Sequence, residues 1–274
     1  MRFLPRRIRH RVQLVKKTFR RFTLKTQCNV FPFELGEFDG FLFGYRKNSV
    51  DEKVLADSFT HDKIFVDVPE FVPDLSHVIL DVGAHIGTFA AFAATKVQTV
   101  YAVEACRETF NLLRANAELN HLSNIRSFHL ALSDRDGPVE LVHSIYGNWG
   151  NSIMYEKKSA SEPVEGMTLD RFVLENEIEK IHFVKFNCEG AEFPILLAAS
   201  LEVLQRFEVM YIHYHEDLSN GLSHQLIIEH LEAAGFAIRR SGPQRSKRGT
   251  LIATHETRQS PQASAEQSVR QDMG

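Results

Sequence analysis

From residue 78 onward, short apolar runs alternate with longer stretches in which apolar residues recur every three or four positions. The short runs have the length of buried strands, and the longer stretches have the period of a helix. Such alternation is typical of parallel βαβ units, so we predict an α/β fold with a doubly wound, mostly parallel sheet. The predicted strands are Val78–Val82, Thr99–Glu104, Ile125–Leu132, Val139–His143, His182–Cys188, Val209–His215, Phe236–Arg240 and Thr250–Thr254, and the predicted helices are Thr88–Thr95, Arg107–Leu119, Leu169–Glu177, Glu192–Arg206 and His224–Ala234.

The segments on either side of this region have other patterns. Residues 31–46 alternate aromatic with polar or small residues, as a hairpin does. We therefore assign residues 31–77 to a hairpin cap that precedes the main domain at 78–254. Residues 255–274 are polar and have no periodicity, so they cannot bury enough apolar surface to become ordered. We therefore predict a disordered tail.

Residues 1–30 predict a basic amphipathic helix. The first 25 residues hold ten of the 32 Lys and Arg residues and no acid, so the rest of the chain carries a charge near −13. Such a helix packs on an acidic body, lies on an anionic membrane surface, or binds another partner such as nucleic acid. We keep the membrane surface as a candidate partner and disfavour nucleic acid. The apolar residues at helical spacing are Leu4, Ile8, Val12, Val15, Phe19 and Phe22.

Composition indicates a cytoplasmic protein. No apolar run approaches the ~20 residues that cross a bilayer, and the N-terminal residues lack the apolar core of a signal peptide. The three cysteines are odd in number and far apart, which is typical of a reducing compartment without disulfides.

A loop with two glycines follows the first predicted strand of the main domain. Gly83 supplies backbone freedom at a sharp turn, and Gly87 has no Cβ to obstruct a ligand at the start of the helix. A dinucleotide motif would have its middle glycine where His85 stands, which disfavours NAD. Asp81, at the carboxyl end of the strand, can pair with a cationic group such as the ammonium of S-adenosylmethionine.

The second predicted strand of the main domain also ends in an acid. Glu104 follows Gly83 by 21 residues, a spacing at which an acid can accept hydrogen bonds from both ribose hydroxyls. A strand–glycine–helix turn alone is common in α/β proteins, and a lone Glu at a strand end is more often solvated. The joint occurrence of Asp81 and Glu104 in this order favours a cofactor site.

Several short motifs in a fixed order carry a family resemblance. They are Asp81–Gly87, Val103–Ala105, Asn116–Asn120, Ala131–Asp134, Thr168–Asp170, Lys185–Glu192 and His213–His215. In these motifs the chain resembles the FkbM-type S-adenosylmethionine-dependent methyltransferases, a branch of the class I Rossmann-like methyltransferases, over residues 78–217. The resemblance implies a seven-stranded sheet whose last strand is antiparallel, and methylation of hydroxyls on glycans or secondary metabolites.

The resemblance also implies which residues bind the cofactor. Asp81, Gly83 and Gly87 would hold its methionine half, Glu104 its ribose, and the loop Leu132–Ser133–Asp134 its adenine. His85 and Asn187 belong to the same motifs, and we count them with the cofactor-binding residues.

Four positions depart from the family's usual residues. The family usually has Asn at His85, Pro at Ala105, Asp at Asn187 and Glu at His213. The last two changes remove carboxylates from the rim where the acceptor should bind. They leave an alternative to an enzyme, namely a catalytically weak or inactive cofactor-binding scaffold, although the intact cofactor loop favours the enzyme.

Three residues at this rim are candidates for removing the acceptor's proton: His213, Glu189 and His215. The two histidines share one strand face, and a neutral histidine is a competent base near pH 7. A histidine in a strand is more often a core residue, and Glu189 can instead cap the next helix. A metal site of the two histidines with Asn187 lacks a third strong ligand, so we predict no metal.

The segment Gly147–Ile153 contains the only tryptophan, Trp149, among glycines and asparagines. It is either a lid that stacks on the acceptor or a turn that places Trp149 in the core.

Overall fold

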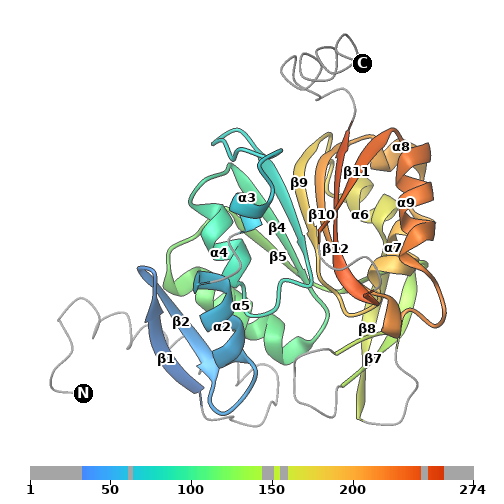
Figure 1. Ribbon diagram of the computed structural model, residues 1–274. Coiled ribbons are helices and arrows are strands. Elements are labelled where there is room, and N and C mark those ends of the chain that lie inside the picture. Colours follow the sequence, from blue (N-terminus) through green and yellow to red (C-terminus); the bar gives the residue numbers. More distant parts are fainter. Residues whose placement is uncertain (1–32, 61–63, 144–150, 155–159, 242–245, 256–274) are drawn as a thin grey trace, which may run out of the picture.

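A twisted seven-stranded sheet forms the centre of the protein (Figure 1). The computed structural model describes residues 33–60, 64–143, 151–154, 160–241 and 246–255. The strand order is β11-β12-β10-β9-β3-β4-β5, and β12 alone of these strands runs antiparallel to both of its neighbours. The predicted α/β fold with its antiparallel last strand is therefore confirmed. The bounds are β3 Val78–Val82, β4 Thr99–Glu104, β5 Ile125–His129, β9 Ile181–Phe186, β10 Phe207–His215, β11 Phe236–Ser241 and β12 Arg248–His255.

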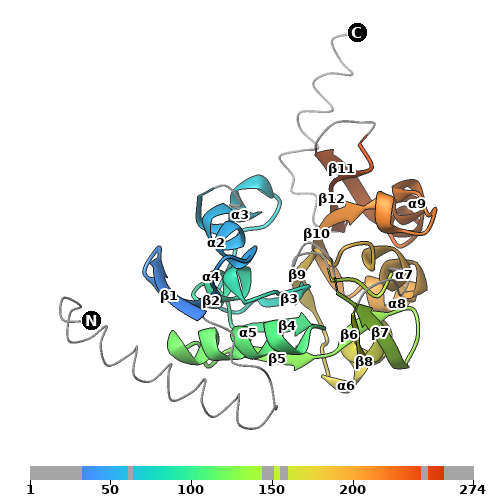
Figure 2. The ribbon, with the colours of Figure 1, turned by 90° about the horizontal axis from the view of Figure 1, so that it is seen from below.

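Helices cover both faces of this sheet (Figures 1 and 2). Alternate strand residues point to opposite faces, so Ile79 packs with α3 and α4 while its neighbour Leu80 packs with α6–α9. Both residues are fully buried, which explains the continuous apolar runs of the strands. The bounds are α4 Thr88–Ala94, α5 Arg107–Leu119, α6 Leu169–Glu175, α7 Glu192–Ala198, α8 Leu201–Leu204 and α9 His224–Ala233.

The residues before β3 form a cap beside α4 and α5. Strands β1 (Phe33–Phe38) and β2 (Phe41–Arg46) make the predicted hairpin. Two short helices, α2 (Asp51–Thr60) and α3 (Ile64–Asp67), follow it and were not predicted.

Asn116 of α5 and Asn120, the residue that follows the helix, bind the hairpin to the main domain. The side chain of Asn120 accepts a hydrogen bond from the amide of Leu42 and donates one to its carbonyl, at 2.8 and 2.7 Å. Asn116 binds the amide and carbonyl of Gly44 in the same way, at 2.7 and 3.1 Å. Their spacing of four residues places both on one side of the helix, where each satisfies backbone groups that a neighbouring strand would otherwise satisfy.

A second, three-stranded sheet corrects two strand predictions. The run Ile125–Leu132 is not one strand, because the chain leaves the large sheet at Leu130 and begins β6 (Ala131–Ser133). Strand β6 pairs with β8 (Ser161–Thr168), which also pairs with β7 (Gly137–Val142). The predicted strand Val139–His143 therefore belongs to this small sheet, and β8, with a proline, a glycine and four polar residues, was not predicted.

The predicted single helix Glu192–Arg206 is also wrong. Helix α7 ends at Ala198, and the hydroxyl of Ser200 accepts a hydrogen bond from the amide of Val203 to cap α8. A Ser at an N-cap position competes with the helical path of the chain, which explains the break.

Some predictions lie outside the described residues. They are the basic helix 1–30, the tail after His255 and the placement of Trp149. Within the described ranges, no helix is long and apolar enough to cross a membrane.

Candidate active site

A cavity of about 510 Å³ lies at the carboxyl ends of β3, β4, β9 and β10. Ligands of open α/β sheets bind at this edge, and the volume lies in the range of small-molecule sites. Of the twelve site residues that the sequence predicts, eight line the cavity: Gly83, His85, Glu104, Leu132, Asn187, Glu189, His213 and His215. Asp81, Gly87, Ser133 and Asp134 do not line it.

Packing of the chain on itself requires the glycine at position 83, whereas at position 87 the backbone conformation favours it. A Cβ on Gly83 would lie 2.1 Å from the carbonyl oxygen of Asn187, and a Cβ on Gly87 would lie 3.4 Å from the Leu113 side chain. Both glycines have positive φ, +78° and +88°. The position of Gly87 therefore differs from the sequence interpretation, because its missing Cβ faces α5 and not the cavity.

We expect Gly83→Ala to lower the free energy of unfolding by about 2 kcal/mol more than Gly40→Ala does. Both residues have similar positive φ, +78° and +82°, but a Cβ on Gly40 has no atom within 4 Å. The control thus carries only the backbone penalty of about 1–2 kcal/mol. Equal losses in urea unfolding would mean that the loop moves away from Asn187 without strain.

Glu104 organises the loop between β3 and α4. Its carboxylate accepts hydrogen bonds from the amides of His85 and Cys106, both at 2.9 Å. Burial raises the pKa of Glu104 to about 6, although these two amides oppose the rise. Each carboxylate oxygen retains a lone pair for a further donor, and the side chain lines the cavity.

Asp81 has a partner within the protein. Lys185 Nζ donates hydrogen bonds to Asp81 Oδ1 at 2.7 Å and to the carbonyl of Gly83 at 3.3 Å. Asp81 is fully buried, and its Oδ2 has no hydrogen bond within the described residues. Burial raises the pKa of Asp81 against the opposing effect of the Lys185 charge. Lys185 thus occupies the place that the sequence interpretation gave to a cationic ligand group.

Lys185 was not among the candidates from the sequence, although it stands in the motif Lys185–Glu192. What identifies Lys185 as a site residue is the register of the strands, because Lys185 lies opposite Asp81 on adjacent parallel strands. Its side chain lines the cavity and lies 5.7 Å from the ring centre of Phe89. Because strand pairing is not visible in one sequence, the pair could not be found from the motifs alone.

One side of the cavity is apolar. Of the predicted adenine loop only Leu132 lines it, since Ser133 is buried and its hydroxyl bonds to Asp134 Oδ1 at 3.0 Å. The remaining apolar residues of this wall come from β4, β7, α7 and the neighbouring loops: Val103, Leu130, Leu141, Ile153 and Ile195.

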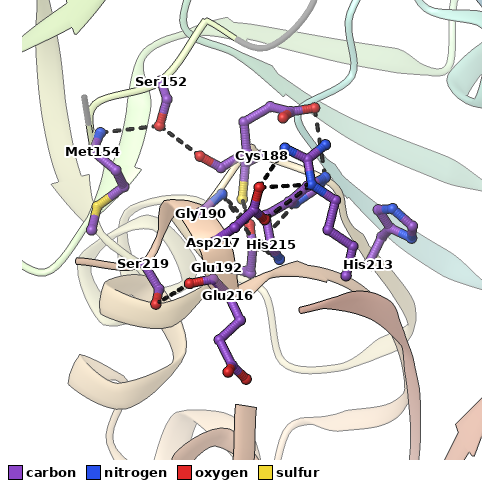
Figure 3. A network of polar contacts seen from close by, with 12 residues as sticks. Ser152, Met154, Cys188, Gly190, Glu192, His213, His215, Glu216, Asp217 and Ser219 are labelled. Atoms are coloured by element: carbon purple, nitrogen blue, oxygen red, sulfur yellow. Dashed lines mark hydrogen bonds and ion pairs between the residues drawn. The ribbon is translucent and has the colours of Figure 1, made fainter. Parts of the chain in front are cut away.

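Near the carboxyl end of β10 lies a buried chain of acidic and histidine side chains (Figure 3). Glu192 has no exposed surface and accepts hydrogen bonds from the His215 amide at 2.6 Å and from the Gly190 amide at 3.0 Å. His215 Nδ1 lies 3.1 Å from Glu192 Oε1, and its Nε2 lies 3.7 Å from Glu189 Oε1. His215 therefore stands between two carboxylates, one buried and one lining the cavity.

Glu192 was not among the candidates from the sequence. Glu189 was instead the acid that was considered from the sequence as a helix cap. In the structure, the amide of Gly190 donates its hydrogen bond to the carboxylate of Glu192 and not to Glu189. Glu189 has a positive φ of 53°, which directs the chain so that its carboxylate lies near His215. The only local signal is the spacing of the two acids on either side of Gly190.

The two histidines have different electrostatic environments. Burial lowers the pKa of His213 to about 4, and His215 adds to this effect. For His215, burial has a lowering effect, but its hydrogen bond to Glu192 and the charges of Glu192 and Glu189 raise its pKa above the ordinary value. His215 is thus the stronger base of the pair. The pKa of Glu189 is itself raised by burial.

The cap supplies a wall of the cavity that the sequence did not predict. Asp57 and Ser58 of α2 and Phe65 of α3 line it together with Tyr211 and His213 of β10. Ser58 donates a hydrogen bond to Thr88 Oγ1 of α4 at 3.0 Å, which joins the cap to the start of that helix.

Among the described residues, one group has ligand atoms close enough for a metal: Cys106, His143 and Glu162, within 4.8 Å of one another. Burial raises the pKa of the Cys106 thiol to about 11, which opposes the thiolate that a metal needs. This group does not include His213 or His215.

The strand order, with its antiparallel β12, and the cavity at the carboxyl ends of the strands define a class I methyltransferase fold. The family profile for the methyltransferase FkbM domain matches residues 81–238, which is more than half of the chain. The chain therefore belongs to the FkbM methyltransferase domain family.

Individual proteins give weaker likenesses. An uncharacterized protein of Methanocaldococcus jannaschii is 24% identical over 174 residues, 62% of this chain and 60% of that protein, so the chain spans less than two thirds of this curated relative. The solved methyltransferase FkbM of Methylobacillus flagellatus KT has 15% identity and a TM-score of 0.45, covering 68% of this chain and 45% of that one. SMU.1697c of Streptococcus mutans, solved in complex with SAH, has 13% identity and a TM-score of 0.44, covering 70% and 96%. Likenesses of this size do not bear on the acceptor.

Proposed function

We propose that the protein is an S-adenosylmethionine-dependent O-methyltransferase that acts on a hydroxyl of a glycan or another small molecule. One observation carries the proposal. A single cavity contains Glu104 beside the glycine loop and, at its other rim, Glu189, His213 and His215. Such a cavity can hold a methyl donor and a hydroxyl acceptor next to each other.

The residues fit this cofactor. Glu104 has carboxylate lone pairs for ribose hydroxyls, and the apolar wall around Leu132 suits a flat base. Gly83, His85 and Asn187 bring backbone and side-chain groups to the remaining part of the cavity. Asp81 acts through Lys185 and the carbonyl of Gly83, so its proposed contact with the cofactor is indirect.

The bound cofactor supplies an electrophilic methyl group, and the protein has to align the acceptor, exclude water and remove one proton. His215 is the best supported base, because Glu192 orients its ring and raises its pKa above the ordinary value. Glu189 lines the cavity together with His215, with its Oε1 3.7 Å from His215 Nε2, and can pass the proton or hold the hydroxyl. His213 remains a candidate that contacts the acceptor in its neutral form.

Two experiments test the function. Calorimetry with S-adenosylmethionine and NAD should give binding of the first and none of the second. A screen of glycan, lipid and polyketide acceptors with cofactor labelled in its methyl group should give label in a hydroxyl-bearing product. Binding without transfer to any acceptor would favour the scaffold alternative.

We further propose that residues 1–25 associate with anionic membranes, since their ten bases contribute roughly 1 kcal/mol each near such a surface. Deleting them should leave a folded, cofactor-binding protein that no longer sediments with phosphatidylserine vesicles. Because salt screens the attraction, sedimentation of the full chain should weaken as ionic strength rises. A full chain that ignores these vesicles at low salt, or a truncated chain that aggregates, contradicts the proposal.

A further inference from the structure

A buried ion pair connects the cap to the cofactor loop. Arg46, at the end of β2, and Asp51, at the start of α2, are 5% and 0% exposed. The guanidinium donates to both carboxylate oxygens of Asp51, at 2.7 and 2.8 Å, and the Arg46 amide donates a third hydrogen bond at 2.9 Å. Arg46 Nη1 also donates to Thr109 Oγ1 of α5 at 3.2 Å. The position of the Asp51 carboxylate is thus fixed from two elements.

The ring of His85 lies between this carboxylate and the cavity. His85 Nε2 is 3.4 Å from Asp51 Oδ1, and the residue lines the cavity. Both ring nitrogens are buried, and neither has a hydrogen bond within the described residues. A buried nitrogen without a partner is unfavourable, so this site is suited to a bound molecule that supplies one.

The protonation of the ring determines what that molecule must offer. Burial lowers the pKa of His85 to about 4, although Asp51 opposes this, so the ring is neutral at pH 7 and carries one proton. Asp51 Oδ1 lies 3.4 Å from Nε2 without hydrogen-bond geometry, and its negative charge favours the tautomer that carries this proton on Nε2. Nδ1 is then an acceptor and requires a donor. The His85 amide donates to Glu104 at 2.9 Å, so a ligand hydroxyl bound by Glu104 would be a donor close to this residue.

We propose that His85 Nδ1 accepts a hydrogen bond from a ribose hydroxyl of the cofactor, and that Asp51 and Arg46 are positioning residues that orient the ring. The inference rests on the proposed function, since it needs a cofactor with a ribose. It makes the cap, which lies before the family-matched residues 81–238, a part of the cofactor site.

The test measures the affinity of the full chain for S-adenosylmethionine by calorimetry. Asp51→Asn should weaken binding about tenfold because the orientation of the His85 ring is lost. His85→Asn should weaken it about tenfold as well, because the ring itself is lost. Asn tolerates the positive φ of 54° at position 85, so the backbone and its bond to Glu104 are retained. The double variant should be no weaker than His85→Asn, since Asp51 acts through His85. Methylthioadenosine, which has the ribose but no amino-acid group, should show the same losses.

Glu70→Gln is the matched control, because Glu70 in the same cap binds Arg239 at 2.6 Å and does not line the cavity. It should leave the affinity within twofold. Unchanged affinity in His85→Asn, losses that multiply in the double variant, or losses absent with methylthioadenosine would each overturn the inference. If Asp51→Asn does not fold, the His85→Asn measurements decide. A wild-type chain that binds no S-adenosylmethionine contradicts the proposed function itself, which keeps the two failures distinct.

Discussion

His215→Asn is expected to lower kcat about 10²–10³-fold and to leave the affinity for S-adenosylmethionine nearly unchanged, measured with an acceptor that the screen identifies. A positioned general base contributes about 10²–10⁴-fold to a proton transfer. His215 is 2% exposed and held by Glu192 through its amide and Nδ1, so its remaining nitrogen has a fixed direction. An asparagine can keep the hydrogen bond to Glu192 but cannot take up the proton.

Two further variants sharpen this prediction. Glu192→Gln should lower kcat about 10²-fold, and the rise of kcat with pH should move to lower pH, because the group that raises the pKa of His215 is lost. His213→Asn should lower kcat only about tenfold, since a histidine with a pKa of about 4 is a weak base. If His213→Asn stops turnover and His215→Asn does not, the base is His213.

Glu104→Gln is expected to weaken S-adenosylmethionine binding about 10- to 100-fold in calorimetry, because hydrogen bonds to a carboxylate are stronger than those to an amide. Glu162→Gln is the matched control. Glu162 also accepts a hydrogen bond from a backbone amide at the start of α5, that of Arg107 at 3.2 Å, but it does not line the cavity. Equal losses in both variants would indicate a general effect on α5.

The pH dependence of binding follows from the raised pKa of Glu104, about 6. Only the ionised carboxylate accepts two hydroxyl hydrogen bonds, so affinity should be constant well above pH 6 and fall as pH decreases through it. At pH 5 we expect affinity about tenfold below that at pH 7, and this dependence should be absent in Glu104→Gln. An affinity that rises towards low pH would contradict the assignment of the ribose to Glu104.

The positions of Asp81 and Glu104 near the carboxyl ends of their strands were predictable from the sequence. Asp81 and Glu104 end strands whose apolar runs are continuous, and both strands are where the pattern placed them. Parallel strands bring their carboxyl ends to one edge, so residues at those ends converge without further information. The same reasoning placed Asn187, Glu189, His213 and His215 near the cavity.

The partners of these residues were not predictable. Lys185 bonds to Asp81 across 104 positions, and Glu192 bonds to His215 across 23. These pairs decide which carboxylate is neutralised and which histidine is basic. A single sequence contains no record of strand register, and one residue of slippage would reverse the face of every side chain.

The sequence by itself determined where the strands of the large sheet lie along the chain, the glycine loop and the acids near the strand ends, because apolar periodicity and turn chemistry are local properties of the chain. Only the tertiary structure decided that Gly87 faces α5, that β6–β8 form a separate sheet, and that α2 and α3 line the cavity. Each of these depends on contacts between segments distant in the chain. Such contacts form where burial and hydrogen bonding are jointly satisfied, and no local pattern specifies them.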